Sequence, residues 1–360
     1  TWSYTPHLKG KKIEYADIWC AGHSLDEVCP EALKEQWVDV NKKGKAFIKS
    51  FKTSKINLKE NCLFDLLPES FLIEFYELKS SISKSVFENF TKPKNYEFMV
   101  DLVAFLHRIE EGRLNLKFEN LDFTDQKVRN NIGKIKDVDP HIQYSPWVTA
   151  TGRLSTIAKS FPILNLNKEL RPCIVPENDV FVELDYNAAE LRVLLALLGQ
   201  QQPKEDMHSW ISKNIFNSKY NRDQTKKKVF AWLYNPKAKN KKLNNYLDRT
   251  KILSKFYKNG IVSTLFGRDI EVSEDKALNY IIQSTASDLF LTSAIKIDKI
   301  LENRKSKIAF CVHDSLVLDM SHEDRELLEK LIFEFSKTKF GIFATNVSMG
   351  KNYGALKKVR

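Results

Sequence analysis

Two apolar segments joined by a short polar turn place the strongest constraint on the fold. Ile308–Val312 is followed by Leu316–Leu318, and only His313, Asp314 and Ser315 lie between them. Short apolar runs on either side of a tight polar turn are typical of a β-hairpin. We therefore expect two adjacent strands with the carboxylate of Asp314 at the tip of the hairpin.

A second aspartate follows another apolar run. Val180–Leu184 ends at Asp185, and a helical pattern then continues to Leu198 and is closed by Gly199. Taken alone, Asp185 is most simply an acid near a helix start, where it interacts favourably with the helix dipole. Together with Asp314 it would present two carboxylates from neighbouring strand ends. Such a pair suits two Mg²⁺ ions in phosphoryl transfer, because magnesium prefers one or two carboxylates plus substrate phosphates.

Basic residues are concentrated in one segment of the chain. Lys213–Lys258 contains fourteen Lys or Arg and two acids, a local charge of +12, whereas the whole chain carries +11. A charge block is usually a solvated face, but a block this concentrated is also typical of a surface that binds polyanions. We therefore expect nucleic acid or a nucleotide phosphate as the partner.

Four side chains inside the basic segment recur at intervals of four: Arg222, Lys226, Phe230 and Tyr234. On a helix this spacing places them along one slowly winding face, and Pro236 is expected to end the helix. The order suits a nucleoside triphosphate, with the cations on the phosphates and the rings on the sugar and base. The alternative is an ordinary helix with a basic surface and an aromatic core.

Composition excludes several classes of protein. With 42% hydrophobic residues among 360, the chain can form a packed core, and no apolar run approaches the roughly 18 to 20 residues of a membrane helix. Five irregularly spaced cysteines indicate reduced thiols in an intracellular compartment rather than a disulfide framework. A zinc site could be assembled from Cys20, His23, Cys29 and Cys62, but the second paired spacing of zinc modules is missing. Simple packing is the better explanation of these cysteines.

The first part of the chain carries helical periodicity only in its second half. Residues 1–65 have a mixed, turn-rich pattern to which no role can be assigned. Residues 66–113 predict two or three packed helices, with Gly112 as a stop, because apolar residues recur there at spacings of three and four. These positions include Phe71, Leu72, Phe75, Leu78, Phe98, Leu102, Phe105 and Leu106.

Six segments resemble, in order, the sequence motifs of family A DNA polymerases, the group that includes bacterial DNA polymerase I. One such match is weak, whereas six in the right order over residues 151–320 are specific. The segments are Thr151–Ser155 (TGRLS), Asp185–Arg192 (motif A, DYNAAELR), Arg222–Tyr234 (motif B, R-x3-K-x3-F-x3-Y), Thr264–Arg268 (TLFGR), Asn279–Asp288 (NYIIQSTASD) and Val312–Asp314 (motif C, VHD).

The resemblance implies an α+β, right-hand polymerase fold with an antiparallel palm sheet, helical fingers and a helical thumb. It assigns residues 66–140 to the thumb and 203–280 to the fingers with motif B. The palm would combine 141–202, which carry motif A, with 281–360, which carry motif C. Residues before the palm are too few for the family's proofreading exonuclease and show no DxE pattern. We therefore expect no proofreading activity from this chain.

The resemblance also implies the residues that bind metal and nucleotide. Asp185 and Asp314 would hold two Mg²⁺ ions, with the carbonyl of Tyr186 completing a site. Glu190 would exclude a ribose 2′-hydroxyl. Apart from the resemblance, we expect Lys226 or a neighbouring group to assist protonation of the leaving pyrophosphate. The side chains expected around the incoming nucleotide are Arg222, Lys226, His208, Phe230, Tyr234 and Glu190.

A second set of residues is implied to contact DNA. These are Arg153, Asn279, Gln283 and His313, the last at the primer end. Two positions depart from the family pattern: Ser315 stands where the family has Glu after the motif C aspartate, and Asn235 replaces the Gly that follows the motif B tyrosine.

We therefore predict a monomeric, template-directed DNA polymerase that adds dNTPs to a primer 3′-hydroxyl by two-metal phosphoryl transfer. Its partners would be primer-template DNA and dNTPs, with no membrane. One alternative is a single-subunit RNA polymerase relative, which the resemblance of Glu190 to a sugar gate disfavours. Another is a non-catalytic, polymerase-derived nucleic-acid-binding module, which the presence of both Asp185 and Asp314 disfavours.

Overall fold

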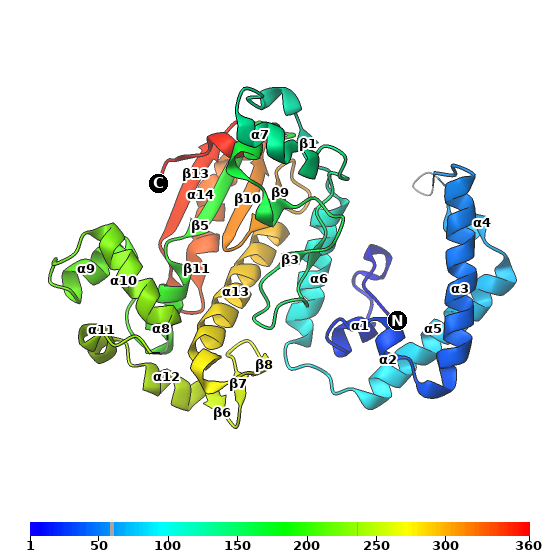
Figure 1. The fold of residues 1–360 in the computed structure, drawn as a ribbon, viewed down its shortest axis with the longest axis horizontal. Coiled ribbons are helices and arrows are strands. Elements are labelled where there is room, and N and C mark those ends of the chain that lie inside the picture. The colour runs from blue at the N-terminus through cyan, green and yellow to red at the C-terminus, as the bar shows by residue number, and fades with distance from the viewer. Residues whose placement is uncertain (58–60, 236) are drawn as a thin grey trace. The chain divides into compact units, whose positions relative to one another are not determined.

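The chain divides into two compact units. The computed structural model describes residues 1–57, 61–235 and 237–360, and its units are Thr1–Ala104 and Phe105–Arg360. Figure 1 shows a first unit made of helices and a second unit in which helices surround a β-sheet. The chain passes from one unit into the next within a single helix, α6 (Tyr96–Glu111).

Two long helices form the body of the first unit, α3 (Glu31–Thr53) and α5 (Glu69–Asn89). Trp37 and Val40 of α3 pack with Phe71 and Ile82 of α5 in one buried cluster. Shorter helices complete the unit: α1 (Ala16–Trp19), α2 (Leu25–Val28) and α4 (Leu63–Leu66). Helices α5 and α6 confirm the helical prediction for 66–113, and Gly112 directly follows α6.

The prediction of a turn-rich segment over residues 1–65 is wrong, because α3 is a regular helix of 23 residues. Its buried positions Trp37, Val40 and Phe51 are separated by polar and basic side chains, which obscure the apolar stripe in the sequence. Gly44 also interrupts the apolar stripe, at the point where α3 approaches the ring of Phe71. A Cβ at Gly44 would lie 3.3 Å from Cζ of Phe71. Glycine weakens a helix assignment made from sequence.

The second unit is built on a five-stranded antiparallel sheet, as an α+β fold predicts. The strand order is β14-β13-β5-β10-β9, so β5, the strand that carries Asp185, lies at the centre (Figure 1). The predicted hairpin is confirmed as β9 and β10. The strands are β5 (Val180–Tyr186), β9 (Lys307–Val312), β10 (Ser315–Met320), β13 (Thr345–Gly350) and β14 (Lys357–Lys358).

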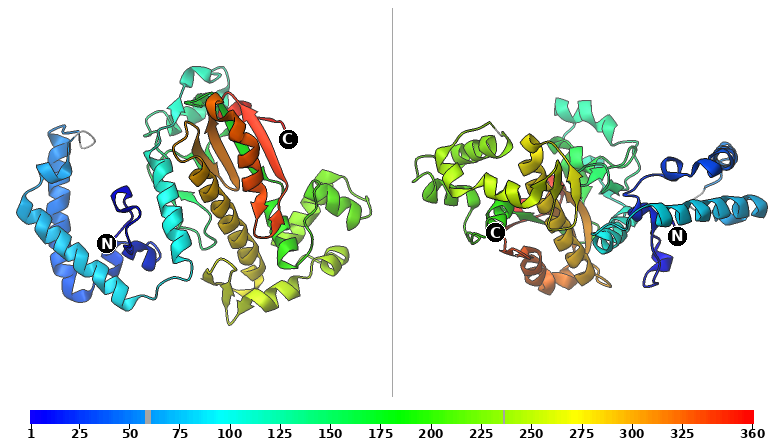
Figure 2. Two further views of the ribbon diagram at one scale, coloured as in Figure 1. Left: turned by 180° about the vertical axis from the view of Figure 1, so that it is seen from behind. Right: turned by 90° about the horizontal axis from the view of Figure 1, so that it is seen from below.

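Two helices, α13 (Glu274–Ile300) and α14 (Leu328–Ser336), lie against one face of this sheet (Figure 2, left). Tyr186 of β5 points towards them, and its ring stacks on Phe335 with 4.4 Å between the centroids. Because successive side chains in a strand point to opposite faces, Asp185 lies on the other face. The alternation therefore separates the packed face of the sheet from the face that carries the carboxylate.

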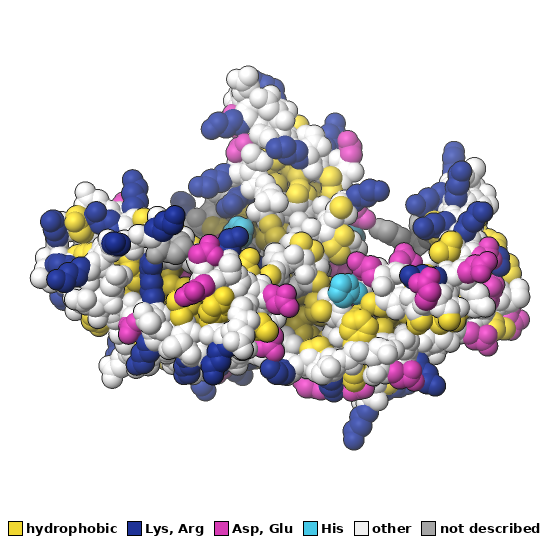
Figure 3. Space-filling view, turned by 60° about the horizontal axis from the view of Figure 1, so that its bottom comes forward, with side chains coloured by type: hydrophobic (Ala, Val, Ile, Leu, Met, Phe, Trp, Pro, Cys, Tyr) yellow, Lys and Arg dark blue, Asp and Glu magenta, His cyan; other side chains and the backbone are white. Residues whose placement is uncertain are grey.

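Helices dominate the segment between β5 and α13, which includes the basic residues. Figure 3 shows Lys and Arg side chains spread over the outer part of this segment. Small strands β6 (Tyr257–Lys258), β7 (Ile261–Ser263) and β8 (Asp269–Glu271) follow the helices. The helices are α8 (Ala189–Leu197), α9 (Met207–Asn214), α10 (Arg222–Tyr234), α11 (Lys241–Tyr246) and α12 (Arg249–Phe256).

Short elements complete the second unit. β1 (Asn115–Leu116) pairs with β4 (Ile174–Val175), and β2 (Tyr144–Ser145) pairs with β3 (Ser155–Thr156). The remaining α-helix and β-strands of this unit are α7 (Gln126–Asn131), β11 (Lys337–Thr338) and β12 (Gly341–Ile342), and short 3-10 helices also occur.

All five cysteines lie in the described part of the chain and are free thiols. Four are buried, and Cys62 is exposed. Burial raises the pKa of Cys173 to about 11, so this thiol stays protonated near neutral pH. Within the described residues, no helix combines the length and the apolar character that a membrane crossing requires.

Candidate active site

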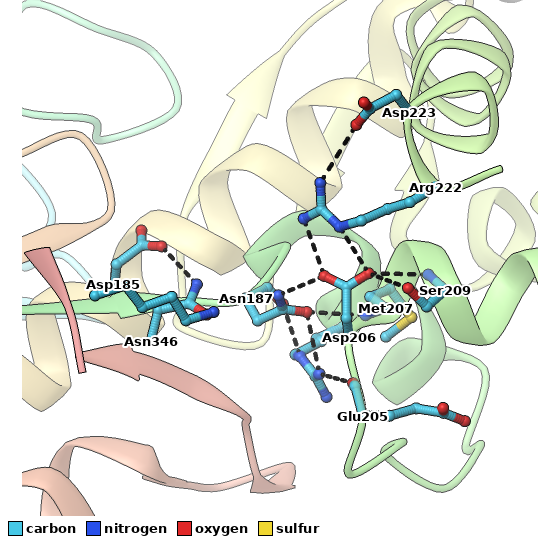
Figure 4. Close-up of polar contacts among 11 residues, drawn as sticks. Asp185, Asn187, Glu205, Asp206, Met207, Ser209, Arg222, Asp223 and Asn346 are labelled. Carbon is cyan, nitrogen blue, oxygen red and sulfur yellow. Dashed lines mark hydrogen bonds and ion pairs between the residues drawn. The ribbon is translucent and has the colours of Figure 1, made fainter. Parts of the chain in front are cut away.

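The register of the sheet brings the two predicted aspartates together. Ser315, the first residue of β10, pairs with Asp185 near the end of β5, so Asp314 in the preceding turn lies beside Asp185. The turn is tight because His313 adopts a left-handed conformation with φ 56°. On the other side of β5, Asn346 pairs with Asp185 and donates a hydrogen bond from Nδ2 to its Oδ2 over 3.0 Å (Figure 4).

The two carboxylates are electrostatically coupled. Burial raises the pKa of Asp185 from 3.8 to about 7, and the negative charge of Asp314 adds to this rise. The hydrogen bond from Asn346 only partly offsets the effect. A pair of carboxylates held in this way is stabilised in its ionised form by a nearby cation.

A third acid, Glu183, lies two residues before Asp185 and on the same face of β5. Its Oε1 accepts a hydrogen bond from the Ser315 hydroxyl over 3.2 Å, and burial raises the pKa of its carboxyl group. Sequence reasoning missed Glu183, although the period-two spacing from Asp185 was available. Ser315, at the position where the resemblance expects Glu, is thus bonded to an acid from the neighbouring strand.

Magnesium remains compatible with this donor set. In the residues that the structure describes, no group of three or more His, Cys, Asp or Glu side chains is close enough to hold a metal ion. The candidate ligands are therefore the two aspartates and a backbone carbonyl, which matches the sparse protein coordination that Mg²⁺ accepts beside substrate phosphates. The side chain of Tyr186 does not compete, because its hydroxyl bonds to Ser293 and Phe335 inside the core.

Helix α10 presents the predicted stripe of side chains on its open face. The helix begins after Asn221, which forms a capping box with Gln224, and it ends at Tyr234, while the expected terminator Pro236 lies outside the described residues. Lys226 Nζ lies 5.7 Å from the centroid of the Phe230 ring, which stacks on Tyr234 at 5.6 Å.

The stripe and the packed side of α10 are different faces of the helix. The buried residues are Thr225, Val229, Trp232 and Leu233. Phe230 is half-buried, and Tyr234 is 39% exposed. The aromatic residue in the core of this helix is therefore Trp232, and the rings of the stripe remain accessible to a ligand.

Glu190 is held between two of the predicted site residues. It lies in the first turn of α8 and is 12% exposed, and its two oxygens accept hydrogen bonds from the Tyr234 hydroxyl and the Arg153 guanidinium. Burial and the charge of Glu190 raise the pKa of Tyr234, which keeps this phenol protonated. These bonds bring the loop between β2 and β3, the start of α8 and the end of α10 together.

The predicted phosphate-binding arginine is engaged by an acid. Arg222 donates from Nε and Nη2 to the two oxygens of Asp206 over 3.1 Å and 3.0 Å. His208, two residues later, is buried, and its ring lies 5.7 Å from that of Phe230. Burial lowers the pKa of His208 to about 4, so the imidazole is neutral near pH 7 in this structure. Its Nδ1 has no hydrogen-bond partner among the described residues.

The predicted DNA-contacting residues lie apart from this network, except for Arg153. Asn279 and Gln283 lie one turn apart on α13, and His313 is exposed at the hairpin tip. Within the described ranges, no hydrogen bond links these three to the other predicted site residues. Asn279 lines a pocket of about 460 Å³ with Leu233 and Arg249.

Comparisons with known proteins agree with the resemblance seen in the sequence. The model of the family described as DNA polymerase family A matches residues 237–355. DNA polymerase I of Thermus aquaticus is 27% identical over 245 residues, which cover 54% of this chain and 29% of that protein. DNA polymerase I of Caldicellulosiruptor bescii is 25% identical over 245 residues, with 53% and 29% covered. The chain thus spans less than a third of the length of these relatives.

One solved structure is described as the POL domain of Pol1 from M. smegmatis in complex with DNA primer-template and dNTP. It aligns with 90% of this chain and 66% of its own chain, with a TM-score of 0.49 and 16% sequence identity.

Proposed function

We propose that this chain carries a polymerase domain of DNA polymerase family A and acts as a template-directed DNA polymerase that adds dNTPs to the 3′-hydroxyl of a primer. One observation carries the proposal: the Asp185–Asp314 pair lies near the stripe on α10. Tyr234, at the end of that stripe, bonds to Glu190, and the negative charge of Asp314 makes a minor contribution to the raised pKa of the Tyr234 phenol. At the other end of the stripe, Arg222 bonds to Asp206, which bonds to Asn187 two residues after Asp185.

Asp185 and Asp314 would hold two Mg²⁺ ions, with the carbonyl of Tyr186. When bound there, the ions would supply Lewis-acid stabilisation of charge on the attacking hydroxyl and on the leaving pyrophosphate. The protein contributes the position of both carboxylates, which the β5–β10 register fixes.

The stripe on α10 would bind the incoming nucleotide. Arg222 and Lys226 would supply positive charge for the triphosphate, and Lys226 or a neighbouring group would assist protonation of the pyrophosphate. Phe230 and Tyr234 offer stacked rings to the sugar and the base. Glu190 would occupy the space that a ribose 2′-hydroxyl needs.

We also assign the palm, the fingers and the thumb of a polymerase to ranges of the chain. Residues 141–202 and 281–360 would form the palm, since β5 belongs to the first stretch and β9, β10 and β13 belong to the second. Residues 203–280 would form the fingers with α9–α12, and 66–140 the thumb, with no role proposed for 1–65. We expect no proofreading exonuclease within residues 1–140.

Extension of a labelled primer on a DNA template tests the proposal. Parallel reactions contain Mg²⁺ with dNTPs, Mg²⁺ with NTPs, or EDTA with dNTPs. Extension with dNTPs that EDTA abolishes supports a DNA polymerase, and extension with NTPs alone would instead indicate an RNA polymerase. DNA binding without any extension would indicate a non-catalytic nucleic-acid-binding module.

A further inference from the structure

A buried amide ties the end of β5 to the helices that follow it. Asn187 is 8% exposed, and its Nδ2 donates to Oδ2 of Asp206 over 2.9 Å. Its Oδ1 accepts hydrogen bonds from Met207 N at 2.9 Å and from Arg192 Nη2 at 3.4 Å. Both ends of the amide are engaged, which fixes its orientation two residues after Asp185 (Figure 4).

The loop that leads to Asp206 is fixed by a buried cation. Arg192 is fully buried and donates from Nε to the carbonyl of Asn187 over 2.7 Å. Its Nη1 donates to the carbonyl of Pro203 at 2.7 Å, and its Nη2 to that of Glu205 at 3.0 Å. One guanidinium therefore holds the end of β5 and this loop at a fixed separation.

Asp206 gathers five hydrogen bonds on its two oxygens. Ser209 donates to Oδ1 from its backbone N and its hydroxyl, over 2.9 Å and 3.0 Å. Arg222 donates to both oxygens, and Asn187 donates to Oδ2. Burial opposes ionisation, but the bonds from Arg222, Asn187 and Ser209 outweigh it and hold the pKa of Asp206 well below its usual range. The group is a carboxylate at any pH near neutrality.

The two oxygens of Asp206 make more hydrogen bonds than a helix cap needs. A cap of α9 requires only the bond from Ser209 to Oδ1. Oδ2 is instead shared between Asn187 and Arg222, and the paired bonds to Arg222 fix the plane of its guanidinium. Figure 4 shows Asp206 between Asn187 on one side and Arg222 on the other.

Arg222 is thereby held in place before a ligand arrives. Its side chain is 51% exposed, and its Nη1 is 3.6 Å from the exposed carboxylate of Asp223. A free arginine side chain loses rotamer freedom when it binds a phosphate, whereas a side chain that is already held has lost that freedom on folding.

We propose that Asp206 positions Arg222 for the triphosphate and that Asn187 holds Asp206 in register with the strand end that carries Asp185. This inference rests on the proposed polymerase function. It makes Asp206 and Asn187 positioning residues, which act on the nucleotide through Arg222 and link the strand of Asp185 to helix α10.

Three substitutions separate positioning from simple support of the fold. Asp206→Asn keeps an oxygen that can cap Ser209 but places an amide donor against the donors of Asn187 and Arg222. Asn187→Asp keeps the acceptor for Met207 and Arg192 but replaces the donor to Asp206 by a carboxylate oxygen that repels it. Asp223→Asn is the matched control, because Asp223 also lies near Arg222 but its side chain is 83% exposed.

The experiment is single-turnover incorporation of one dNTP on a primed template, with a melting curve for each protein. Asp206→Asn and Asn187→Asp should raise the apparent Kd for dNTP by about tenfold or more, as expected for losing charge-assisted hydrogen bonds. Their maximal rates should stay within about threefold of wild type, because neither residue contacts the reacting atoms. Asp223→Asn should change neither quantity by more than about twofold.

Provided that the wild-type protein extends primers, either of two results would overturn the inference. A lowered melting temperature with an unchanged Kd in both variants would assign Asn187 and Asp206 to structure alone. A decreased Kd would mean that Asp206 competes with the triphosphate for Arg222. If wild-type protein incorporates no dNTP, the proposed function fails first, and this inference fails with it.

Discussion

Ser315 pairs with Asp185 across β10 and β5, and this single register places the turn residue Asp314 beside Asp185. A shift by one residue would turn the side chains of one strand to the opposite face of the sheet and separate the carboxylates. The candidate metal site therefore depends on strand pairing between segments 130 residues apart in sequence, counted from Asp185 to Ser315.

The first prediction concerns the two carboxylates. Asp185→Ala and Asp314→Ala should each lower primer extension by at least about a hundredfold, since each removes charge that stabilises the transition state. Affinity for primer-template should change little, because DNA binding would rest on many distributed basic groups. Extension assays and filter binding at fixed salt measure the two quantities. Substantial extension by either variant would reject the metal assignment.

The second prediction is that metal-free protein loses stability as the pH rises from about 4 to about 7. An unfolded chain releases the Asp185 proton near pH 3.8, whereas the folded protein retains it to about pH 7. The folded state binds more protons across this window, so the free energy of unfolding falls with rising pH, by up to about 4 kcal/mol from this group.

Urea unfolding in EDTA at about pH 4.5 and pH 8 measures this effect in wild type and Asp185→Asn. The variant keeps the shape of the side chain without the carboxylate, so its stability relative to wild type should increase at the higher pH. Equal pH dependence in the two proteins would contradict the raised pKa of Asp185.

Local sequence patterns were sufficient to predict the elements that carry the chemistry. Short-range periodicity and turn residues were enough to predict three elements: the strand that carries Asp185, the hairpin tip at Asp314 and the helix Arg222–Tyr234. Such signals survive in a single sequence because strands and helices impose fixed spacings on their apolar side chains.

Contacts between distant segments were not predictable in the same way. Asp206 lies two residues before the predicted site residue His208, but its bonds to Asn187 and Arg222 depend on how the loop before α9 packs. The bond between Ser315 and Glu183 depends on strand register. Helix α3 was missed because basic side chains and Gly44 interrupt its apolar face.

The third prediction concerns sugar selection. Glu190→Ala should raise incorporation of rNTP relative to dNTP by at least about tenfold, equivalent to about 1.4 kcal/mol of lost exclusion. Glu190 is held by Tyr234 and Arg153, which would keep its carboxylate in the space of a 2′-hydroxyl. Single-nucleotide insertion rates for matched rNTP and dNTP give the ratio. The exposed acid Glu326 provides a control, and Glu326→Ala should leave the ratio unchanged.

The fourth prediction concerns Gly152, which has a φ of +71°. A Cβ at this position would lie 2.5 Å from the guanidinium of Arg268, which is bonded to the buried Asp288. Gly152→Ala should therefore destabilise the protein by about 2 kcal/mol or more, through backbone strain and the displaced ion pair. Because Arg153 follows directly, extension should fall as well. Chemical denaturation measures the loss, and an unchanged midpoint would show that the loop relaxes without cost.

The last prediction concerns Phe230, the uncharged ring that follows Lys226 along the stripe. Its phenyl ring has no hydroxyl, so it cannot replace the hydrogen bond that a missing 3′-hydroxyl would have made within the nucleotide. If the proposed polymerase function is correct, the protein should therefore discriminate against dideoxynucleotides. Phe230→Tyr should relax this discrimination by one to two orders of magnitude, because a hydrogen bond to a charged group contributes roughly 1.5 to 3 kcal/mol.

The position of Phe230 in the structure makes this substitution informative. The ring is half-buried and stacks on Tyr234, while the packed face of α10 is formed by other residues. An added hydroxyl should therefore reach the ligand side rather than a closed core. Insertion kinetics for paired dNTP and ddNTP, with a melting curve, distinguish a hydroxyl that faces the ligand from one that is buried in the core. An unchanged ratio together with a lowered melting temperature would mean that the hydroxyl is buried without a partner and that Phe230 does not face the sugar.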